Sequence, residues 1–415
     1  MQKLNYSTTI AIDSMRSVFH FYSMAGNDKT TVAHHIKSFA DRPFNEDFFK
    51  KFKDAVKEFA ENTPSEKVRK VTLILPDSVV LTDTVKIPTM QGFGQTKKTL
   101  GITLGGLYRN YKDLRVISHA AKQNKQYSTF TIAAVQNNII SSIYAACSEN
   151  KLLVDTLTYA SSATVGGAVL VNPKLKNATY LLLDIKDVYS RFVFVVNGKT
   201  VGFYTLPFGL EFLRKPKVTQ EDMLFDHSYA ELTVLNARER AKSKKLTVMA
   251  IGEDPTDNDE ASDAEETLED VNVEEDEATP DEEESAEYTA ELVRPQINQK
   301  IFTRKAPRKL PKFMLREIPE TEEGIAYENF RVFVKWALTL ISGNEKLTEL
   351  GKPELVCVNI PDDLAGVIDA ANEEAEENGI MFTRLTSEKG ESAFLSNLEL
   401  YGGLFPRQIA STTKF

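Results

Sequence analysis

The sequence is poor in the features that mark an extracellular, zinc-binding or membrane-spanning protein. Its 415 residues include only two cysteines, Cys147 and Cys357, which excludes a disulfide scaffold and a cysteine-rich zinc module. No run approaches the ~18 consecutive apolar residues of a membrane span, and the opening MQKLNYSTT lacks the apolar segment of a signal peptide. We therefore expect an intracellular, soluble protein, with room for two or three domains.

Familiar catalytic and metal-binding motifs are also missing. The five histidines are scattered, and the chain has no H-E-x-x-H, C-x-x-C or G-x-S-x-G pattern. The segment GFGQTKKT, from Gly92 to Thr99, invites comparison with a phosphate-binding P-loop, but Lys97 stands where the second glycine belongs. This glycine-rich segment is better explained as a flexible connector.

Acidic charge is concentrated in one stretch. Residues 253–287 hold 19 of the 60 Asp and Glu residues and no Lys or Arg, so the remaining chain is mildly basic. Such a block cannot bury enough apolar surface to offset its ordering entropy, and we expect 253–299 to be an acidic disordered insertion. The basic remainder could favour an anionic partner or a membrane surface, or could be an average without a focused patch, and no nucleic-acid partner is predicted.

The two halves of the chain begin alike. TTIAIDSMRSVFHFYSM has the pattern of a strand pair, and so does TYLLLDI followed by SRFVFVVNGKTVGFYTL, with a hairpin turn at Asn197-Gly198. In each half the first strand ends near an aspartate, Asp13 and Asp184. Helical patterns alternate with strands after both pairs, including one at about 228–244. The repetition predicts a duplicated α/β protein with two lobes.

Each of these aspartates opens a turn that looks like a damaged phosphate-binding turn. Such a turn needs an Asp for the metal, a Gly for close backbone approach and a hydroxyl. The first turn keeps Asp13 and Ser17 but has Met15 in place of Gly. The second keeps Asp184 and Ser190 but has Lys186 there. One strand-end Asp alone would be structural, whereas two at equivalent places favour a nucleotide-binding ancestry.

On these residues the chain resembles the PilM family, the actin-like proteins of bacterial type IV pilus assembly within the actin, FtsA and sugar-kinase superfamily. The stretch YLLLDIKDVYSRFVFVVNGKTVGFYTLPFGLEFL is the most specific match, and LPDSVVLTDTVKIPTM and FTIAAVQNNIISSIYAACSENKLLVDTLTYASSATV are similar to further family segments. The resemblance implies an α/β, two-lobed actin-like ATPase fold. Its lobes would be duplicated and ribonuclease H-like, with an inserted small subdomain.

The resemblance also implies a domain layout. Residues 1–175 would form the first actin-like lobe, with the inserted subdomain at about 88–160. Residues 176–252 and 300–415 would form the second lobe, around the acidic insertion. The C-terminal helix is a candidate to pack on the first lobe.

Departures from the family pattern predict a pseudo-ATPase. Members that bind ATP carry glycines in both turns and a Ser-Gly-Gly turn beneath the adenine, where this chain has Asn359-Ile360-Pro361. We expect Lys186 to fill the emptied site or to pair with Asp184 or Asp187. No catalytic residue and no cofactor is predicted. Should Mg-ATP bind after all, Asp13 and Asp184 would hold the metal. The vestigial nucleotide-binding candidates are Asp13, Ser17, Asp184, Lys186, Ser190 and Asn359.

By resemblance, the protein would be a cytoplasmic scaffold at the inner face of the cell membrane, held there through partners. It would bind the cytoplasmic tail of a PilN-type inner-membrane protein and contact components of the pilus assembly motor. An extended peptide could bind by strand addition in a groove beside the inserted subdomain. The candidate groove residues, assigned by region only, are Ile87, Met90, Ala133, Ala134 and Tyr144.

Two other functions of the same superfamily remain open. The first is a weak ATP-binding, FtsA-like protein of filaments or cell division. The polar tail PRQIASTTKF is too short for the amphipathic anchor of such proteins. The second is a carbohydrate kinase, for which no catalytic base is identifiable.

Overall fold

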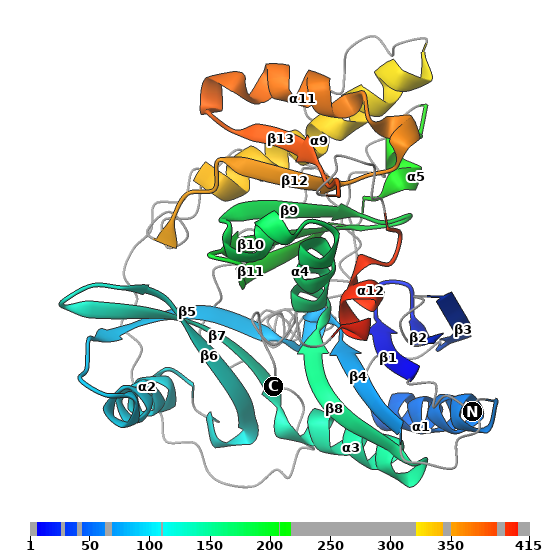
Figure 1. Cartoon of the computed structure of the whole chain (residues 1–415), viewed down its shortest axis with the longest axis vertical. Coiled ribbons are helices and arrows are strands. Elements are labelled where there is room, and N and C mark those ends of the chain that lie inside the picture. Colours follow the sequence, from blue (N-terminus) through cyan, green and yellow to red (C-terminus); the bar gives the residue numbers. More distant parts are fainter. Residues whose placement is uncertain are drawn as a thin grey trace, which may run out of the picture.

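The computed structural model describes residues 6–25, 30–39, 44–62, 69–108, 111–206, 208–216, 321–342, 350–387 and 395–405. These residues form two stacked lobes and a smaller subdomain that projects from one side (Figure 1). The expected acidic insertion at 253–299 and the helix expected at about 228–244 lie outside the described residues.

The first lobe is built on a five-stranded sheet with the order β3-β2-β1-β4-β8. Strands β1 (Tyr6–Asp13), β2 (Val18–Ala25) and β3 (Thr30–Ser38) form an antiparallel meander. Strands β4 (Arg69–Leu75) and β8 (Leu152–Tyr159) continue the sheet in parallel with β1. The expected strand pair around Asp13 is present, and β3 is an addition to it.

Two helices pack together in this lobe, α1 (Glu46–Asn62) and α3 (Asn137–Glu149). The Asn45 side chain accepts a hydrogen bond from the Phe48 amide at 2.8 Å, which satisfies a free donor at the start of α1. Apolar residues at helical spacing then turn one face of α1 to the core, as its sequence pattern predicts. The aromatic rings that meet there are Phe19, Phe21, Phe39, Phe44, Phe48, Phe52 and Phe59.

The second lobe repeats the strand order of the first, as β11-β10-β9-β12-β13. Strands β9 (Tyr180–Ile185), β10 (Ser190–Val196) and β11 (Lys199–Leu206) form the meander. Strands β12 (Leu355–Asn359) and β13 (Met381–Arg384) extend it in parallel. Two sheets with the same order and the same strand directions confirm the duplicated α/β fold.

Helices and one tight turn complete the second lobe. Helices α9 (Glu322–Ser342) and α11 (Val367–Ala375) pack on each other, and the short α5 (Leu210–Leu213) contacts α9. The turn between β10 and β11 has φ values of 51° at Asn197 and 72° at Gly198. These left-handed conformations confirm the predicted Asn-Gly hairpin.

The projecting subdomain is a three-stranded sheet with the order β5-β7-β6, covered by helix α2 (Phe93–Leu107). Its strands are β5 (Leu81–Pro88), β6 (Leu114–Gln123) and β7 (Tyr127–Gln136). The expectation that the glycine-rich segment is a flexible connector is wrong, because that segment forms α2. One face of the helix is buried in the small core through residues spaced four apart, Leu100, Leu104 and, just past the helix end, Tyr108. This packing offsets the helix-weakening effect of the four glycines in α2.

The subdomain is shorter than the expected range of about 88–160. Strand β8 pairs with β4 in the first sheet, and α3 packs against α1 of the first lobe. The apolar pattern of these two elements resembles that of the preceding ones, so periodicity alone could not separate them. The inserted unit therefore runs from β5 to β7.

Two helices rich in small residues lie between the lobes, α4 (Ala160–Val171) and α12 (Leu398–Leu404) (Figure 1). A side chain at Gly167 would meet the Leu398 carbonyl, and one at Gly402 would meet the Ala163 carbonyl. Helix α12 also contacts β1, where a Cβ at Gly403 would meet the side chain of Thr9. Glycine is therefore required for this close packing, which brings the C-terminal segment against the first lobe.

Among the described residues, no helix combines the length and the apolar character needed to cross a lipid bilayer.

Candidate functional site

Polar side chains gather where the parallel strands of both sheets end. Asp13 ends β1, and Asp77 lies two residues after the end of the neighbouring β4. Asp184 lies near the end of β9, and Asn359 ends the neighbouring β12. The carboxyl ends of neighbouring parallel strands open at the same edge of a sheet, which is where α/β proteins place their ligand sites. The two lobes turn these edges toward each other.

Asp13 is held mainly by the backbone of its own turn. Its Oδ1 accepts hydrogen bonds from the Met15 amide at 3.0 Å and the Arg16 amide at 3.1 Å, and the Tyr189 hydroxyl of the second lobe donates to Oδ2 at 3.2 Å. Burial opposes ionisation of this carboxyl. Neighbouring His20, the Arg16 amide and Lys186 outweigh that effect and hold the pKa of Asp13 at about 2. Asp13 is therefore a carboxylate at neutral pH.

Asp184 is completely buried and is surrounded by side chains instead. The Asn359 amide donates to its Oδ1 at 2.8 Å. Its Oδ2 lies 3.5 Å from Lys186 Nζ and 3.6 Å from Arg191 Nη1. Two cations therefore face one carboxylate, in a region that water does not reach.

Lys186 stands where the resemblance predicts a glycine, and its side chain is fully buried. The expected pairing with Asp184 is present, but the shortest contact is from Lys186 Nζ to Glu399 Oε2 of α12, at 2.5 Å. The ammonium also donates to the Ser396 carbonyl at 3.2 Å. Burial would raise the pKa of Glu399, yet Lys186 and Arg191 hold that pKa below its usual range. Lys186 therefore links the second lobe to the C-terminal segment through Glu399 and Ser396.

Arg191 connects the second lobe to the first. Its Nε lies 2.7 Å from Asp77 Oδ2, and its Nη1 donates to the Thr164 hydroxyl of α4 at 3.0 Å. The Ser161 amide and hydroxyl each donate to Asp77 at 2.8 Å. Burial alone would lower the pKa of Arg191, but Asp77 and the other acidic neighbours raise it, so the guanidinium stays charged.

These contacts form one set of charges, here called the interlobe network. It holds four carboxyl groups and two cations, all buried: Asp13, Asp77, Asp184, Glu399, Lys186 and Arg191. At its rim, Arg16 of the first turn and Asp187 of the second make a more exposed ion pair at 2.8 Å. Burial raises the pKa of Asp77, although Arg191 and Ser161 act against the rise. Each of the two cations contacts carboxyl groups from more than one segment of the chain, so the network joins the lobes.

The remaining predicted nucleotide-site residues are engaged in local structure. The Ser190 hydroxyl donates to the Phe208 carbonyl at 2.5 Å. Ser17 has a positive φ of 53°, and its carbonyl accepts from the Phe39 amide at 2.8 Å. Asn359 bonds to Asp184 and also exchanges hydrogen bonds with the backbone of Leu395.

Sequence reasoning missed four members of the site: Asp77, Tyr189, Arg191 and Glu399. A usable signal existed for two of them. Arg191 is the only charged residue in the otherwise apolar strand SRFVFVV, and Asp77 follows a strand end as Asp13 does. Glu399 carried no such signal, because its role depends on packing between segments 213 residues apart in sequence.

The predicted groove residues do not line one open surface. Ala133 belongs to the core of the first lobe, whereas Ile87 and Ala134 belong to the small core under α2. Only Met90, which is half-buried, and Tyr144, whose exposed fraction is 38%, reach solvent. Burial raises the pKa of the Tyr144 hydroxyl, while nearby Arg115 at the start of β6 acts against the rise. The Tyr144 hydroxyl therefore lies within electrostatic range of Arg115 on the edge strand β6.

Within the described part of the chain, no group of three or more His, Cys, Asp and Glu side chains is arranged to hold a metal ion.

Comparison with known proteins gives matches in structure only. No protein-family model and no curated protein sequence matches the chain. Among solved structures, the PilM–PilN type IV pilus biogenesis complex matches with 12% identity and a TM-score of 0.50. That match covers 97% of this chain and 98% of the other.

Two further structures match more weakly. The cytoplasmic domain of EpsL, an inner-membrane component of the type II secretion system of Vibrio cholerae, has 10% identity and a TM-score of 0.34, over 49% of this chain and 71% of that one. A Bacteroides thetaiotaomicron protein of actin-like ATPase fold and unknown function has 11% identity and a TM-score of 0.31, over 55% and 76%. The match to the PilM–PilN complex over nearly the whole chain, together with the two repeated sheets, gives the chain a PilM-like, actin-like fold.

Proposed function

We propose that this protein is a cytoplasmic actin-like scaffold of a type IV pilus or a related secretion machine, and that it works without nucleotide hydrolysis. Its partner would be the cytoplasmic tail of a PilN-type inner-membrane protein, through which it would reach the membrane and the assembly motor. The fold supports this role, because the likeness to the PilM–PilN complex extends over nearly the whole chain.

The observation that supports nucleotide independence is the interlobe network. Asp13 and Asp184, the two candidate metal ligands, already have hydrogen-bond or charged partners from the protein. Lys186 and Arg191 supply the positive charge that a bound magnesium ion would otherwise bring. A triphosphate entering this region would also meet four carboxyl groups. The residues present therefore do not fit Mg-ATP, and we derive no hydrolytic step.

The edge strand β6 supports peptide binding by strand addition. In the order β5-β7-β6, one outer strand, β5, contacts β11 of the second lobe, while β6 is the opposite edge. An extended peptide can pair with the free backbone groups of such an edge. Tyr144, within electrostatic range of Arg115 on β6, would then supply an aromatic contact, a common source of binding energy at protein interfaces.

The test is titration of a fluorescently labelled N-terminal cytoplasmic peptide of the PilN-type protein from the same organism. We expect saturable binding that Tyr144→Ala weakens by roughly tenfold, in line with loss of one interface aromatic. Leu153→Ala on β8 is the matched control, because Leu153 is also a half-exposed apolar residue of the first lobe. A peptide that does not bind the wild-type protein would contradict the proposed partner. ATP binding would instead favour the FtsA-like alternative.

A further inference from the structure

The outer end of the inserted subdomain combines lysines with exposed apolar side chains. The loop after β5 lies against the turn between β6 and β7, where the Thr89 amide donates to the Gln126 carbonyl at 2.9 Å and the Thr89 hydroxyl to the Asn124 carbonyl at 2.8 Å. The Asn124 side chain in turn accepts from the Tyr127 amide at 2.7 Å and so shapes the turn. We call the side chains displayed there the lysine tip: Lys86, Met90, Phe93, Lys97, Lys98, Lys125 and Tyr127.

Acidic residues are scarce in the sequence around the lysine tip. Residues 84–136 contain eight Lys or Arg and a single acidic residue, Asp113. All four lysines on β5, α2 and the β6–β7 turn that belong to the tip are exposed, and none forms an ion pair with a described residue. Lysines of the first lobe behave differently. Lys37 pairs with Glu58 at 2.7 Å, and Lys53 with Glu149 at 2.6 Å.

Apolar side chains stand among these lysines. Phe93 precedes the buried Leu100 by seven residues and so continues the inner stripe of α2, yet 85% of its surface is exposed. Tyr127 is 45% exposed, and the Lys86 ammonium lies 5.2 Å from its ring centre. At this exposure Phe93 contributes little to the core.

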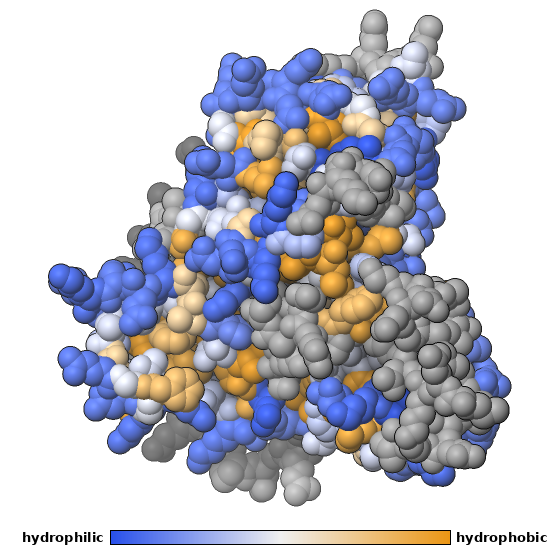
Figure 2. Space-filling view, in the orientation of Figure 1, coloured by the Kyte–Doolittle hydropathy of each residue, from blue (hydrophilic) through white to orange (hydrophobic). Residues whose placement is uncertain are grey.

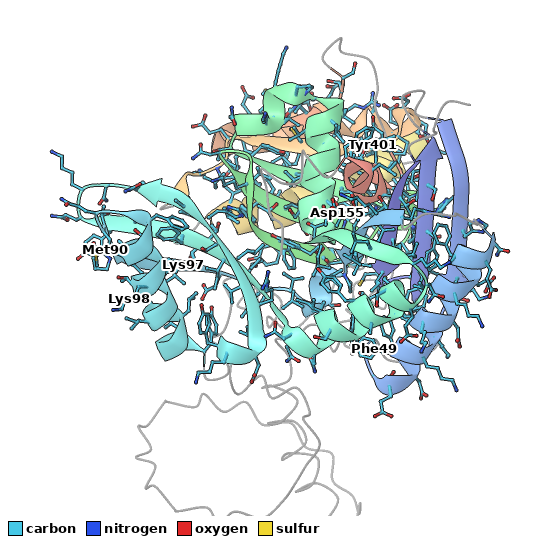
Figure 3. The ribbon with its side chains drawn as sticks, turned by 60° about the horizontal axis from the view of Figure 1, so that its bottom comes forward. Phe49, Met90, Lys97, Lys98, Asp155 and Tyr401 are labelled. Carbon is cyan, nitrogen blue, oxygen red and sulfur yellow. The ribbon has the colours of Figure 1, made fainter. Side chains whose placement is uncertain are left out.

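The tip also projects away from the lobes. Met90, Lys97 and Lys98 lie together at the far end of the subdomain, well apart from Phe49 and Tyr401 on the main body (Figure 3). Hydrophilic side chains cover this projecting end in the space-filling view, with more apolar ones over α2 beside them (Figure 2). A broad surface can therefore approach it without touching the lobes.

We propose that the lysine tip binds an anionic lipid bilayer, with the lysines at the headgroups and Phe93 and Tyr127 at the acyl boundary. Lysine is a point charge that needs no fixed bidentate geometry, which suits a diffuse array of headgroup phosphates. An aromatic ring beside basic residues is the composition of peripheral membrane anchors. The contact is direct and uses no membrane partner, so it stands or fails independently of the proposed function.

The experiment is co-sedimentation of the full chain with two kinds of vesicle. One is phosphatidylcholine alone, and the other is phosphatidylcholine with about one third phosphatidylglycerol. We expect binding only to the anionic vesicles, with a loss of roughly thirtyfold for Lys97→Gln/Lys98→Gln and roughly tenfold for Phe93→Ser. The controls Lys174→Gln/Lys176→Gln and Met381→Ser remove two exposed lysines and an apolar side chain that is 57% exposed, all away from the tip, and should bind as wild type.

Three results would overturn the proposal. The first is equal sedimentation with neutral and anionic vesicles, and the second is equal loss in the tip variants and their controls. The third is no sedimentation of the wild-type chain with the anionic vesicles. Circular dichroism of each variant separates a folding defect from lost binding.

Discussion

The first turns of the two lobes occupy equivalent places in the repeated sheets, yet they stabilise their aspartates by different means. In the first lobe, two backbone amides of the turn donate to Asp13. In the second lobe, Asp184 depends on the side chains of Asn359, Lys186 and Arg191. Backbone donors need only the local turn. The side-chain partners of Asp184 come from the rest of the second lobe, and two of them, Lys186 and Arg191, also bond to Glu399 of α12 and to Asp77 of the first lobe.

The comparison shows how a nucleotide-type site becomes part of the structure. Neither Met15 nor Lys186 has a positive φ, so each of these two positions accepts a side chain without backbone strain. In the second turn that side chain is a cation, which neutralises Asp184 and reaches Glu399. The second turn should therefore matter more for the stability of the whole fold than the first.

The largest effect is expected from Arg191→Met, which breaks the second-lobe side of the comparison. Removing the guanidinium leaves Asp77 and Asp184 buried with one cation fewer, at a cost of about 3–5 kcal/mol in the free energy of unfolding. Urea denaturation measures the change. Arg214→Met, which breaks an exposed pair with Asp363, is the control and should cost less than about 1 kcal/mol. Equal losses for the two variants would contradict the role of the network.

An intermediate effect is expected at Asp13, on the first-lobe side. Because its pKa falls from 3.8 to about 2 on folding, ionised Asp13 stabilises the fold above pH ~4, and this contribution is lost as the pH falls from about 4 to about 2. Asp13→Asn should thus cost about 2 kcal/mol at pH 7 and progressively less in that acidic range. Unfolding free energies measured from pH 7 to pH 3 test this. A cost that does not change with pH would mean that Asp13 acts only as a hydrogen-bond acceptor.

The smallest effect is expected from Arg16→Gln, which removes the exposed ion pair between the first turn and Asp187 of the second turn. Its partner Asp187 is more than half exposed, so solvent screens the pair and its loss should cost less than about 1 kcal/mol. The same urea titration applies, repeated at high salt, where wild type and variant should become equal. A loss of unfolding free energy as large as that of Arg191→Met would mean that the rim pair, rather than the buried network, holds the lobes together.

Much of the fold could be predicted from the sequence, because the strand pairs and the hairpin at Asn197-Gly198 carry local signals. The glycine-rich helix α2 could not, since its stability comes from packing Leu100 and Leu104 onto the subdomain sheet rather than from helix propensity. Only part of the candidate site could be predicted from the sequence. Strand-end aspartates mark its edge, but the partnership of Lys186 with Glu399 arises only when the C-terminal segment packs between the lobes.

The central claim is that the protein's own charges satisfy the interlobe site without nucleotide. Its most direct test is calorimetric titration of the full chain with Mg-ATP, beside Asp13→Ala and Asp184→Ala variants whose folding has been verified. The account predicts no binding heat for any of the three proteins and no thermal stabilisation by nucleotide. Micromolar binding to the wild type that both substitutions abolish would contradict it, and would show that Asp13 and Asp184 still serve a nucleotide.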